Sequence, residues 1–284
     1  MRKIKLISDS TCDLSPELIH KHEIEIVPLY VSFGEESYKD GIDLKTEEMY
    51  RIIKEKGELP KTSAVAPGEF EQIFQKYLDL DYDILYMGIG SKFSGTFQSA
   101  MLAKKLLESE NIYLVDSANL SSGTGLLLLK AAQFRDAGMD VLEIKEKVEG
   151  LVPLVRSQFV IDTLEYLYKG GRLNALSALM GKMLRVHPLI KVVDGKMDVG
   201  KKAMGSMRKG LQILLDQALQ DQAYMDQDFM MITHSLADEH YQYIHKKIAG
   251  AFDIKNVYET HAGCVISTHC GAGTIGILYI LKNE

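Results

Sequence analysis

Three short segments place hydroxyl groups and one imidazole where loops are expected. They are residues 61–63 (KTS), residues 94–96 (SGT) and residues 268–269 (TH). Hydroxyl groups, backbone N–H groups and an imidazole can all donate hydrogen bonds, and several such donors hold an anion without a buried ion pair. The three segments therefore indicate a site that recognises an anionic or strongly hydrogen-bond-accepting group.

The second of these segments comes directly after the apolar run ILYMGIG and before a helical pattern. At the carboxyl end of a parallel strand, the start of a helix presents unpaired N–H groups and a partial positive charge. Ser94 is expected to cap the helix, and Gly95 carries no side chain that would keep a ligand from the backbone. Capping alone is the alternative interpretation, and it applies equally to residues 61–63, which precede Pro67 at a predicted helix start.

The third segment contains the histidine. In ISTHCGAGTIG, Thr268 and His269 are predicted to leave a strand and enter the glycine turn at residues 271–273. A single histidine is usually structural, but one that precedes a glycine turn at a strand end is well placed to line a cleft.

All three segments belong to an alternation of strand and helix. Strand patterns occur in KIKLIS, EIEIVPLYVSF, DILYMGI and NIYLVDS, and helical patterns in KTEEMYRIIKEKG and FSGTFQSAMLAKKLLES. Such alternation predicts a mainly parallel, open sheet with helices on both faces. After Gly150 the pattern restarts with the strand candidates QFVID, LIKVV, FMMITH, VYETHA and TIGILYI. We therefore predict an α/β fold of two domains, residues 1–150 and residues 151–284, with a ligand in the crevice between them.

Composition limits the classes of function. The formal net charge of −6 argues against nucleic acid as a partner, since phosphate binding requires clustered cations. The three cysteines have neither zinc-site nor disulfide spacing, so no metal site and a reducing, cytoplasmic environment are predicted. No signal-peptide pattern opens the sequence, and no apolar run reaches the roughly 18 residues of a membrane span. An integral membrane segment is therefore not expected, although a transient membrane contact remains open.

Motifs in order along the whole chain resemble those of the DegV family, which includes the fatty-acid-binding subunit of bacterial fatty acid kinase. The matching segments are IKLISDSTCDL, YKDGID, KTS, FSGTFQSA, NIYLVDS, DTLEYLYKGGRL and THCGAG. The resemblance implies a two-domain α/β fold that encloses one long-chain fatty acid between its domains. It also implies that the protein is not an enzyme, needs no cofactor, and presents the fatty-acid carboxylate to a separate ATP-dependent kinase subunit that forms acyl-phosphate.

The same resemblance assigns the contacts to the carboxylate. They fall on Thr62, Ser63, Ser94, Gly95, Thr96 and His269. Two departures from the family pattern bear on affinity and head-group geometry. Residues 64–66 are Ala-Val-Ala where the family has Gln-Pro-Ser, and Ala272 replaces a proline in the turn after the histidine.

The acyl chain requires a long apolar slot. Residues 125–134 (GLLLLKAAQF) and 176–190 (LSALMGKMLRVHPLI) are rich in leucine and methionine, and the 13 methionines would suit an adaptable lining. Burying roughly sixteen carbons at about 0.8 kcal/mol each would contribute about 12 kcal/mol, more than the head-group hydrogen bonds. Ordinary core packing is the alternative for each of these residues.

Basic residues gather in a chain that is acidic overall. They are Lys169, Arg172, Arg185, Lys201, Lys202, Arg208 and Lys209. A solvated charged surface is the simplest interpretation. The resemblance implies a docking surface for the kinase subunit, for which Arg172 and Arg208 are the candidates.

Two enzymatic alternatives use the loop formed by Gly88, Gly90 and Ser94. A dinucleotide site would need G-x-G-x-x-G, but the third glycine is displaced to Gly95. A hydrolase would combine Ser94 and His269 with Asp9 or Asp116, although the G-x-S-x-G turn of such enzymes is absent from the sequence.

Overall fold

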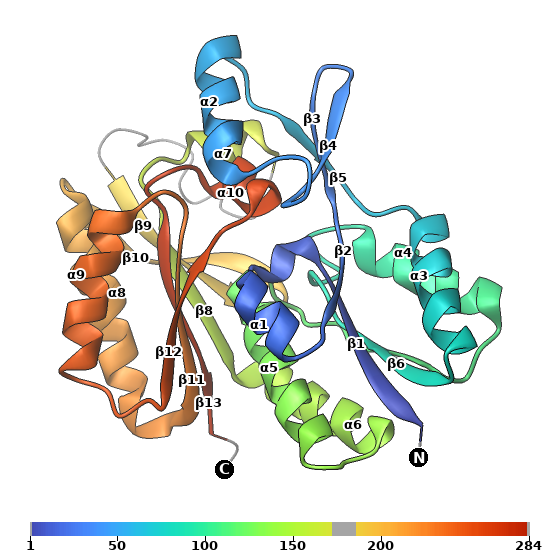
Figure 1. Cartoon of the computed structure of the whole chain (residues 1–284). Helices are drawn as coiled ribbons and strands as arrows, with labels where there is room; N and C mark the ends of the chain where they lie inside the picture. Colours follow the sequence, from blue (N-terminus) through green and yellow to red (C-terminus); the bar gives the residue numbers. More distant parts are fainter. Residues whose placement is uncertain (1, 172–185, 283–284) are drawn as a thin grey trace.

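The computed structural model describes residues 2–171 and 186–282, which form three β-sheets and the helices that cover them (Figure 1). Arg172 and most of the predicted lining segment 176–190 therefore lie outside the described residues. Both ends of the chain lie at the same end of the molecule.

The first half of the chain builds a parallel sheet of four strands. Their order is β2 (Glu25–Val27), β1 (Lys3–Asp9), β6 (Tyr82–Tyr86) and β7 (Ile112–Leu114), and every neighbouring pair is parallel. The helices of this half are α1 (Pro16–Lys21), α2 (Thr46–Lys56), α3 (Pro67–Asp79), α4 (Thr96–Leu107), α5 (Ser122–Asp136) and α6 (Val141–Leu151). Ile7 packs with Phe70 and Ala100 of α3 and α4, whereas Leu6 packs with Leu127 of α5. The sheet is thus covered on both faces, as the alternating pattern predicts.

The run EIEIVPLYVSF forms two strands instead of one. β2 ends at Val27, and β3 (Tyr30–Phe33) joins a separate antiparallel sheet in the order β4-β3-β5. Pro28 lies at the break, where its missing N–H cannot contribute to a ladder. The partners of β3 are β4 (Glu36–Lys39) and β5 (Lys61–Ser63), so the KTS segment is a short strand.

The second half builds a six-stranded mixed sheet. Its order is β10 (Lys196–Met204), β9 (Val186–Val193), β8 (Val155–Val160), β13 (Ile275–Leu281), β11 (Met225–His234) and β12 (Asn256–His261). Only β11 and β12 are parallel. The further helices are α7 (Glu165–Lys169), α8 (Met207–Asp221), α9 (Asp238–Ala249) and α10 (Cys264–Cys270). The five strands predicted for this half are confirmed, and β10 is an addition.

Helix α5 is buried between the two large sheets. Leu126, Leu127, Leu128 and Leu129 are fully buried in one core with Leu85 of β6 and with residues of β11 and β13. A helix that contacts a sheet on each side must be apolar all round, which explains the run of leucines. The expectation that this segment lines a ligand tunnel is therefore wrong.

Helix α10 brings the second half of the chain into the first. It contacts α2, β3 and β5, and Figure 1 shows it beside α2 and α7. The predicted boundary near Gly150 falls within the last turn of α6. The division into domains at residues 1–150 and 151–284 stays a prediction.

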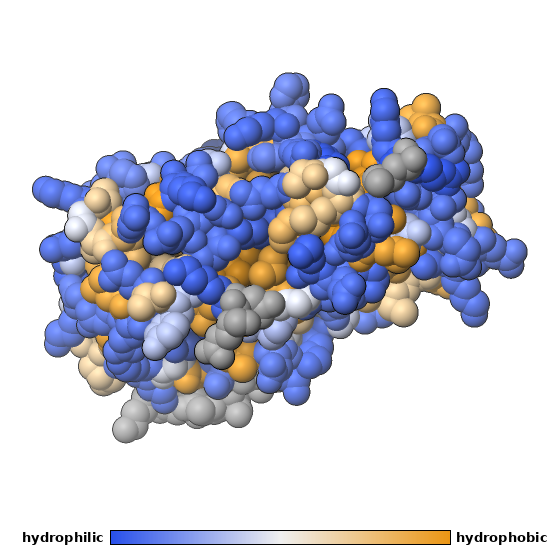
Figure 2. Space-filling model, turned by 90° about the horizontal axis from the view of Figure 1, so that it is seen from below, coloured by the Kyte–Doolittle hydropathy of each residue, from blue (hydrophilic) through white to orange (hydrophobic). Residues whose placement is uncertain are grey.

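The surface seen from the end where the termini lie is mostly hydrophilic, with hydrophobic residues in separate patches (Figure 2). Among the described residues, no helix has the length and apolar character that crossing a bilayer requires.

Candidate functional site

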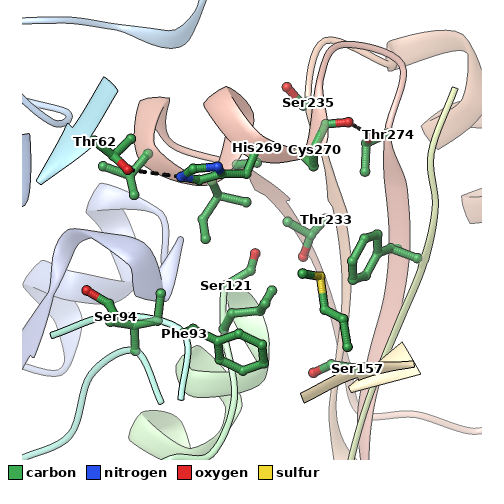
Figure 3. Close-up of a pocket in the computed structure, with 18 of the residues that line it drawn as sticks. Thr62, Phe93, Ser94, Ser121, Ser157, Thr233, Ser235, His269, Cys270 and Thr274 are labelled. Atoms are coloured by element: carbon green, nitrogen blue, oxygen red, sulfur yellow. Dashed lines mark hydrogen bonds between the residues drawn. The ribbon is translucent and has the colours of Figure 1, made fainter. Parts of the chain in front are cut away.

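A cavity lies where β5, the loop after β6, helix α10 and the sheet strands β8 and β13 meet. It is partly open to solvent. Thr62, Ser63, Ser94 and His269 line it together with many apolar side chains, which include Phe93, Phe159, Leu167, Met197 and Leu278. Figure 3 shows Thr62, Ser94 and His269 on one side of the cavity and Ser157 on the other. Apolar side chains thus form much of the wall, and Thr62, Ser94 and His269 lie together at one end, which is called the polar end below.

A hydrogen bond joins the two halves of the chain at this polar end. Oγ1 of Thr62 lies 2.9 Å from Nε2 of His269, although the residues are 207 positions apart (Figure 3). Thr62 is fixed because β5 pairs with β3, where Val31 is opposite Thr62. Two of the predicted segments thus meet in space.

His269 belongs to a helix, so the prediction of a strand at this point is wrong. The N–H of Gly263 donates to Asp13 at 2.9 Å, and the N–H of Cys264 donates to Asp40 at 2.7 Å. These carboxylates satisfy the first N–H groups of α10 and interact favourably with its dipole. Burial raises the pKa of Asp40 and raises that of Asp13 well above its usual range.

Gly170 of the KGG motif lies against the histidine. A Cβ atom at Gly170 would be 2.4 Å from Nδ1 of His269 and 2.9 Å from the carbonyl oxygen of Tyr166. Only glycine permits this approach of the end of α7 to the ring. The sequence indicates a glycine turn here, but it gives no sign that the turn supports His269.

The loop before Ser94 is fixed by a buried carboxylate. Asp9 is fully buried and accepts hydrogen bonds from Thr11, from the phenol of Tyr86 and from the N–H of Ile89. Burial raises the pKa of Asp9 despite these donors. A Cβ at Gly88 would lie 2.0 Å from this carboxylate, so Gly88 is required by the protein's own packing.

The residues of the enzymatic alternatives have structural partners. Gly90 lies against the backbone of Asn119, whose N atom would be 2.8 Å from an added Cβ. Asp116 accepts hydrogen bonds from the N–H groups of Ser91 and Ala118 at 3.0 and 2.9 Å. These contacts give no support to a dinucleotide site at the glycines or to a triad through Asp9 or Asp116.

Ser94 precedes the cap of α4 instead of being the cap. The capping position is Gly95, and Oγ of Ser94 accepts the N–H of Thr96 at 3.2 Å and lies 2.9 Å from Oγ1 of Thr96. Thr96 is fully buried, and neither Gly95 nor Thr96 lines the cavity. The structure thus brings Thr62, Ser63, Ser94 and His269 to one cavity and places Thr96 behind Ser94. That these residues contact a ligand stays a prediction.

Further hydroxyl groups, which the sequence did not reveal, also line the cavity. They belong to Ser121, Ser157, Thr233, Ser235 and Thr274. Ser157 donates to Asn119 Oδ1 at 2.6 Å, Thr274 donates to the carbonyl of Cys270 at 2.8 Å, and Ser121 donates to Asp13. Because their protons are already engaged, these side chains offer few donors to a ligand. Ser157 and Thr233 lie in strands, Ser121 precedes α5, and Ser235 and Thr274 lie in loops, all with no distinctive local pattern.

The chain is similar to known proteins along nearly its whole length. A model of the family described as "Uncharacterised protein, DegV family" matches residues 3–282. A DegV domain-containing protein from Clostridium acetobutylicum is 35% identical over 283 residues, which cover 99% of this chain and 100% of the relative. The chain belongs to the DegV family.

Solved DegV structures share the fold. A DegV family protein from Thermus thermophilus, whose structure is described as showing fatty acid binding, is 25% identical with a TM-score of 0.93, and the match covers 99% of this chain and 100% of that one. DegV of Bacillus subtilis, described as a fatty acid binding protein, is 29% identical with a TM-score of 0.86 over 99% and 100% of the two chains. A stearic acid-binding protein from Eubacterium ventriosum is 27% identical with a TM-score of 0.86, over 98% of each chain. The α/β fold predicted for this DegV protein is confirmed.

Of the two predicted docking residues, Arg208 lies within the described residues. It is in α8, and its guanidinium carbon lies 3.6 Å from the centroid of the Tyr243 ring. Its role in docking stays a prediction, as does that of Arg172.

Proposed function

We propose that this DegV protein binds one long-chain fatty acid in the cavity, with the carboxylate at Thr62, Ser94 and His269. The observation that carries the proposal is the convergence of these three side chains, from distant parts of the chain, on one end of a mostly apolar cavity. The description of related structures as fatty acid binding supports it.

Proton positions favour Ser94 as a donor. Thr96 is fully buried, and the only acceptor that the described residues offer to its hydroxyl is Oγ of Ser94. A buried hydroxyl normally uses its proton, so Thr96 donates to Ser94. The proton of Ser94 is then available for a carboxylate.

The hydrogen-bonded pair Thr62 and His269 can supply a second donor to the carboxylate. When Nε2–H of His269 donates to Oγ1 of Thr62, the hydroxyl of Thr62 is free to donate to the same carboxylate. Hydrogen bonds to a charged group contribute about 1.5–3 kcal/mol each. Two donors from separate segments would orient the head group, while burial of the acyl chain would supply most of the affinity.

We further propose that the bound carboxylate is presented to a separate ATP-dependent kinase subunit, which forms the acyl-phosphate. In this proposal the protein is a carrier in the cytoplasm and not the catalyst, and Arg172 and Arg208 contribute to docking. The position of the polar end, with Thr62, Ser94 and His269 only part-buried, is compatible with access from outside.

Native mass spectrometry and equilibrium binding test the carrier proposal. The purified protein should retain one fatty acid per chain. Thr62→Val and Ser94→Ala should each weaken fatty acid binding about tenfold or more, because each removes a charge-assisted hydrogen bond. Affinity for the corresponding fatty acid methyl ester should change little.

Ser32→Ala is the matched control, since Ser32 lies on β3 and its hydroxyl bonds to Ser37 instead of lining the cavity. Bound dinucleotide, turnover of an ester, or equal weakening by all three substitutions would refute the proposed function.

A further inference from the structure

A second concave region lies where strands β8 and β9 separate. Their ladder contains only three pairs, Gln158↔Lys191, Phe159↔Ile190 and Val160↔Leu189. β8 begins earlier, at Val155, and β9 continues to Val193, so these strand ends diverge. A cleft with about 1,150 Å³ of space, partly open to solvent, occupies the split.

Two cations line this cleft. Gln158 and Lys191 are opposite each other in the ladder, and Arg156 lies two positions from Gln158. Arg156 and Lys191 therefore project from the same face of neighbouring strands, at diagonal positions that long side chains can bridge. Within residues 2–171 and 186–282, neither takes part in an ion pair.

Both cations have donor capacity to spare. One terminal nitrogen of Arg156 donates to the carbonyls of Pro153 and Val155, at 3.0 and 3.3 Å. Lys191 donates one proton to Oε1 of Gln217 at 2.9 Å. Arginine has five N–H donors and lysine three, so most of their protons have no protein acceptor in the described part of the chain.

Two acids lie in the same cleft, so the charges of its lining are equal in number, but one acid accepts a hydrogen bond from a phenol and the other is exposed. Asp221 and Asp194 also line it. Asp221 accepts the phenol of Tyr279 at 2.8 Å, and Asp194 is exposed in the turn after β9. Burial lowers the pKa of Lys191, Asp221 and Asp198 raise it, and Lys201 and Arg156 lower it, so that the net direction is downward. A bound anion would relieve this unfavourable environment.

We infer that the cleft binds a dianionic phosphate group, held by Arg156 and Lys191. The planar guanidinium can bond two phosphate oxygens at once, and the ammonium of Lys191 supplies a second charge to a third oxygen. The chemical class is therefore a phosphate monoester or free phosphate.

The cleft is separate from the lipid cavity, although the two adjoin. Ser157 lines both, and its hydroxyl donates at 2.6 Å to Oδ1 of Asn119, which lines the cleft, so this hydrogen bond forms part of the partition. A phosphate in the cleft and a fatty acid in the cavity can thus be bound together.

Titration calorimetry on fatty-acid-loaded protein tests the inference. The probes are inorganic phosphate, glycerol 3-phosphate and dihexanoyl phosphatidic acid. Inorganic phosphate or glycerol 3-phosphate should bind saturably, and Arg156→Met or Lys191→Met should weaken that binding about tenfold or more. Lys196→Met is the matched control, because it removes the same charge from the same hairpin without lining the cleft. It should leave binding unchanged.

The three probes distinguish the source of the phosphate. Tighter binding of the short phosphatidic acid than of glycerol 3-phosphate, with the same response to the variants, would indicate a lipid head group. Equal or weaker binding would indicate a free small phosphate. Either result supports the site.

Three results would overturn the inference. They are the absence of saturable binding by all probes, binding that is equal in Arg156→Met, Lys191→Met and Lys196→Met, and competition between inorganic phosphate and the fatty acid. Fatty acid content and thermal unfolding of each variant show whether the fold is retained. If Arg156→Met and Lys191→Met both impair folding, the same titration is made with Arg156→Lys and Lys191→Gln. Phosphate binding equal to that of the wild type in these two variants would then overturn the inference, and weaker binding would support it.

Discussion

Single hydrogen atoms decide what the polar end of the cavity can hold. Ser94 and Thr62 each have a neighbour that can satisfy the oxygen while leaving the hydroxyl proton for a ligand. Thr96 and His269 are these neighbours. Thr96 touches no part of the cavity, so its proposed effect on a ligand acts through Ser94.

Substitution of Thr96 isolates this indirect effect. Thr96→Val keeps the buried volume but removes the donor to Ser94, so we expect fatty acid affinity to fall about two- to tenfold, the worth of one neutral hydrogen bond. Thr96→Ser should restore it. Affinity for the methyl ester, measured in parallel, should stay constant in both variants. Unchanged or tighter fatty acid binding in Thr96→Val would contradict this assignment of protons.

Short elements position His269 through close packing. Helix α10 is anchored at its start by Asp13 and Asp40, and the end of α7 lies against the imidazole through Gly170. Because the two ends of α10 are held by parts of the chain distant in sequence, the ring has a defined place opposite Thr62.

Gly170→Ala tests this packing. The added methyl group would overlap the ring, so His269 or the end of α7 must move. We expect fatty acid affinity to fall about tenfold, because the bond from His269 to Thr62 would be lost. Gly68→Ala in α3 is the control, since a Cβ there meets no atom within 4 Å. The account of α7 fails if isothermal titration finds both variants equal to the wild type.

At the scale of helices and strands, the sequence predicts some elements better than others. Ser94 follows a clear signal, since it lies beside the helix start marked by Gly95, and Thr62 lies on the short strand that leads towards the helix start at Pro67. Residues 264–270 contain Val, Ile and Thr, which favour a strand locally. Their helical conformation depends on Asp13, which is 250 positions from Gly263. No local pattern reports such a contact.

The lining of the cavity shows a related limit. A run of leucines such as Leu126–Leu129 has the same appearance whether it fills a core or lines a tunnel. Phe93, Phe159 and Met197, which do line the cavity, come from three separate segments. Only the packing of the sheets brings them together.

Across the whole molecule, one buried cation links α5 to the six-stranded sheet. Lys130 is 5% exposed and donates to Asp226 and Asp228 of β11, at 2.6 and 2.7 Å. Hydrogen bonds from Lys130 and then Lys255 lower the pKa of Asp228 to about 2. A lowered pKa in the folded protein stabilises it above the ordinary value of 3.8, and this contribution is lost as pH falls through about 2.

The pH dependence of stability should reveal this link. Asp228→Asn should lower the free energy of unfolding at pH 7, and the difference from the wild type should shrink as pH falls from about 4 towards 2. Urea unfolding at a series of pH values measures it. Glu149→Gln is the control, because its ion pair with Lys145 is largely exposed and should contribute less than about 0.5 kcal/mol. A difference for Asp228→Asn that stays constant with pH would be inconsistent with the proposed linkage.

The central claim is that the cavity holds a fatty acid by its carboxylate at the end formed by Thr62, Ser94 and His269. A crystal structure of the protein with palmitate tests it most directly. We predict that one carboxylate oxygen lies within hydrogen-bonding distance of the Ser94 hydroxyl and the other within that distance of Thr62, with the chain running past Phe93 towards Ser157. A carboxylate at the Ser157 end, or palmitate bound outside the cavity, would contradict the claim.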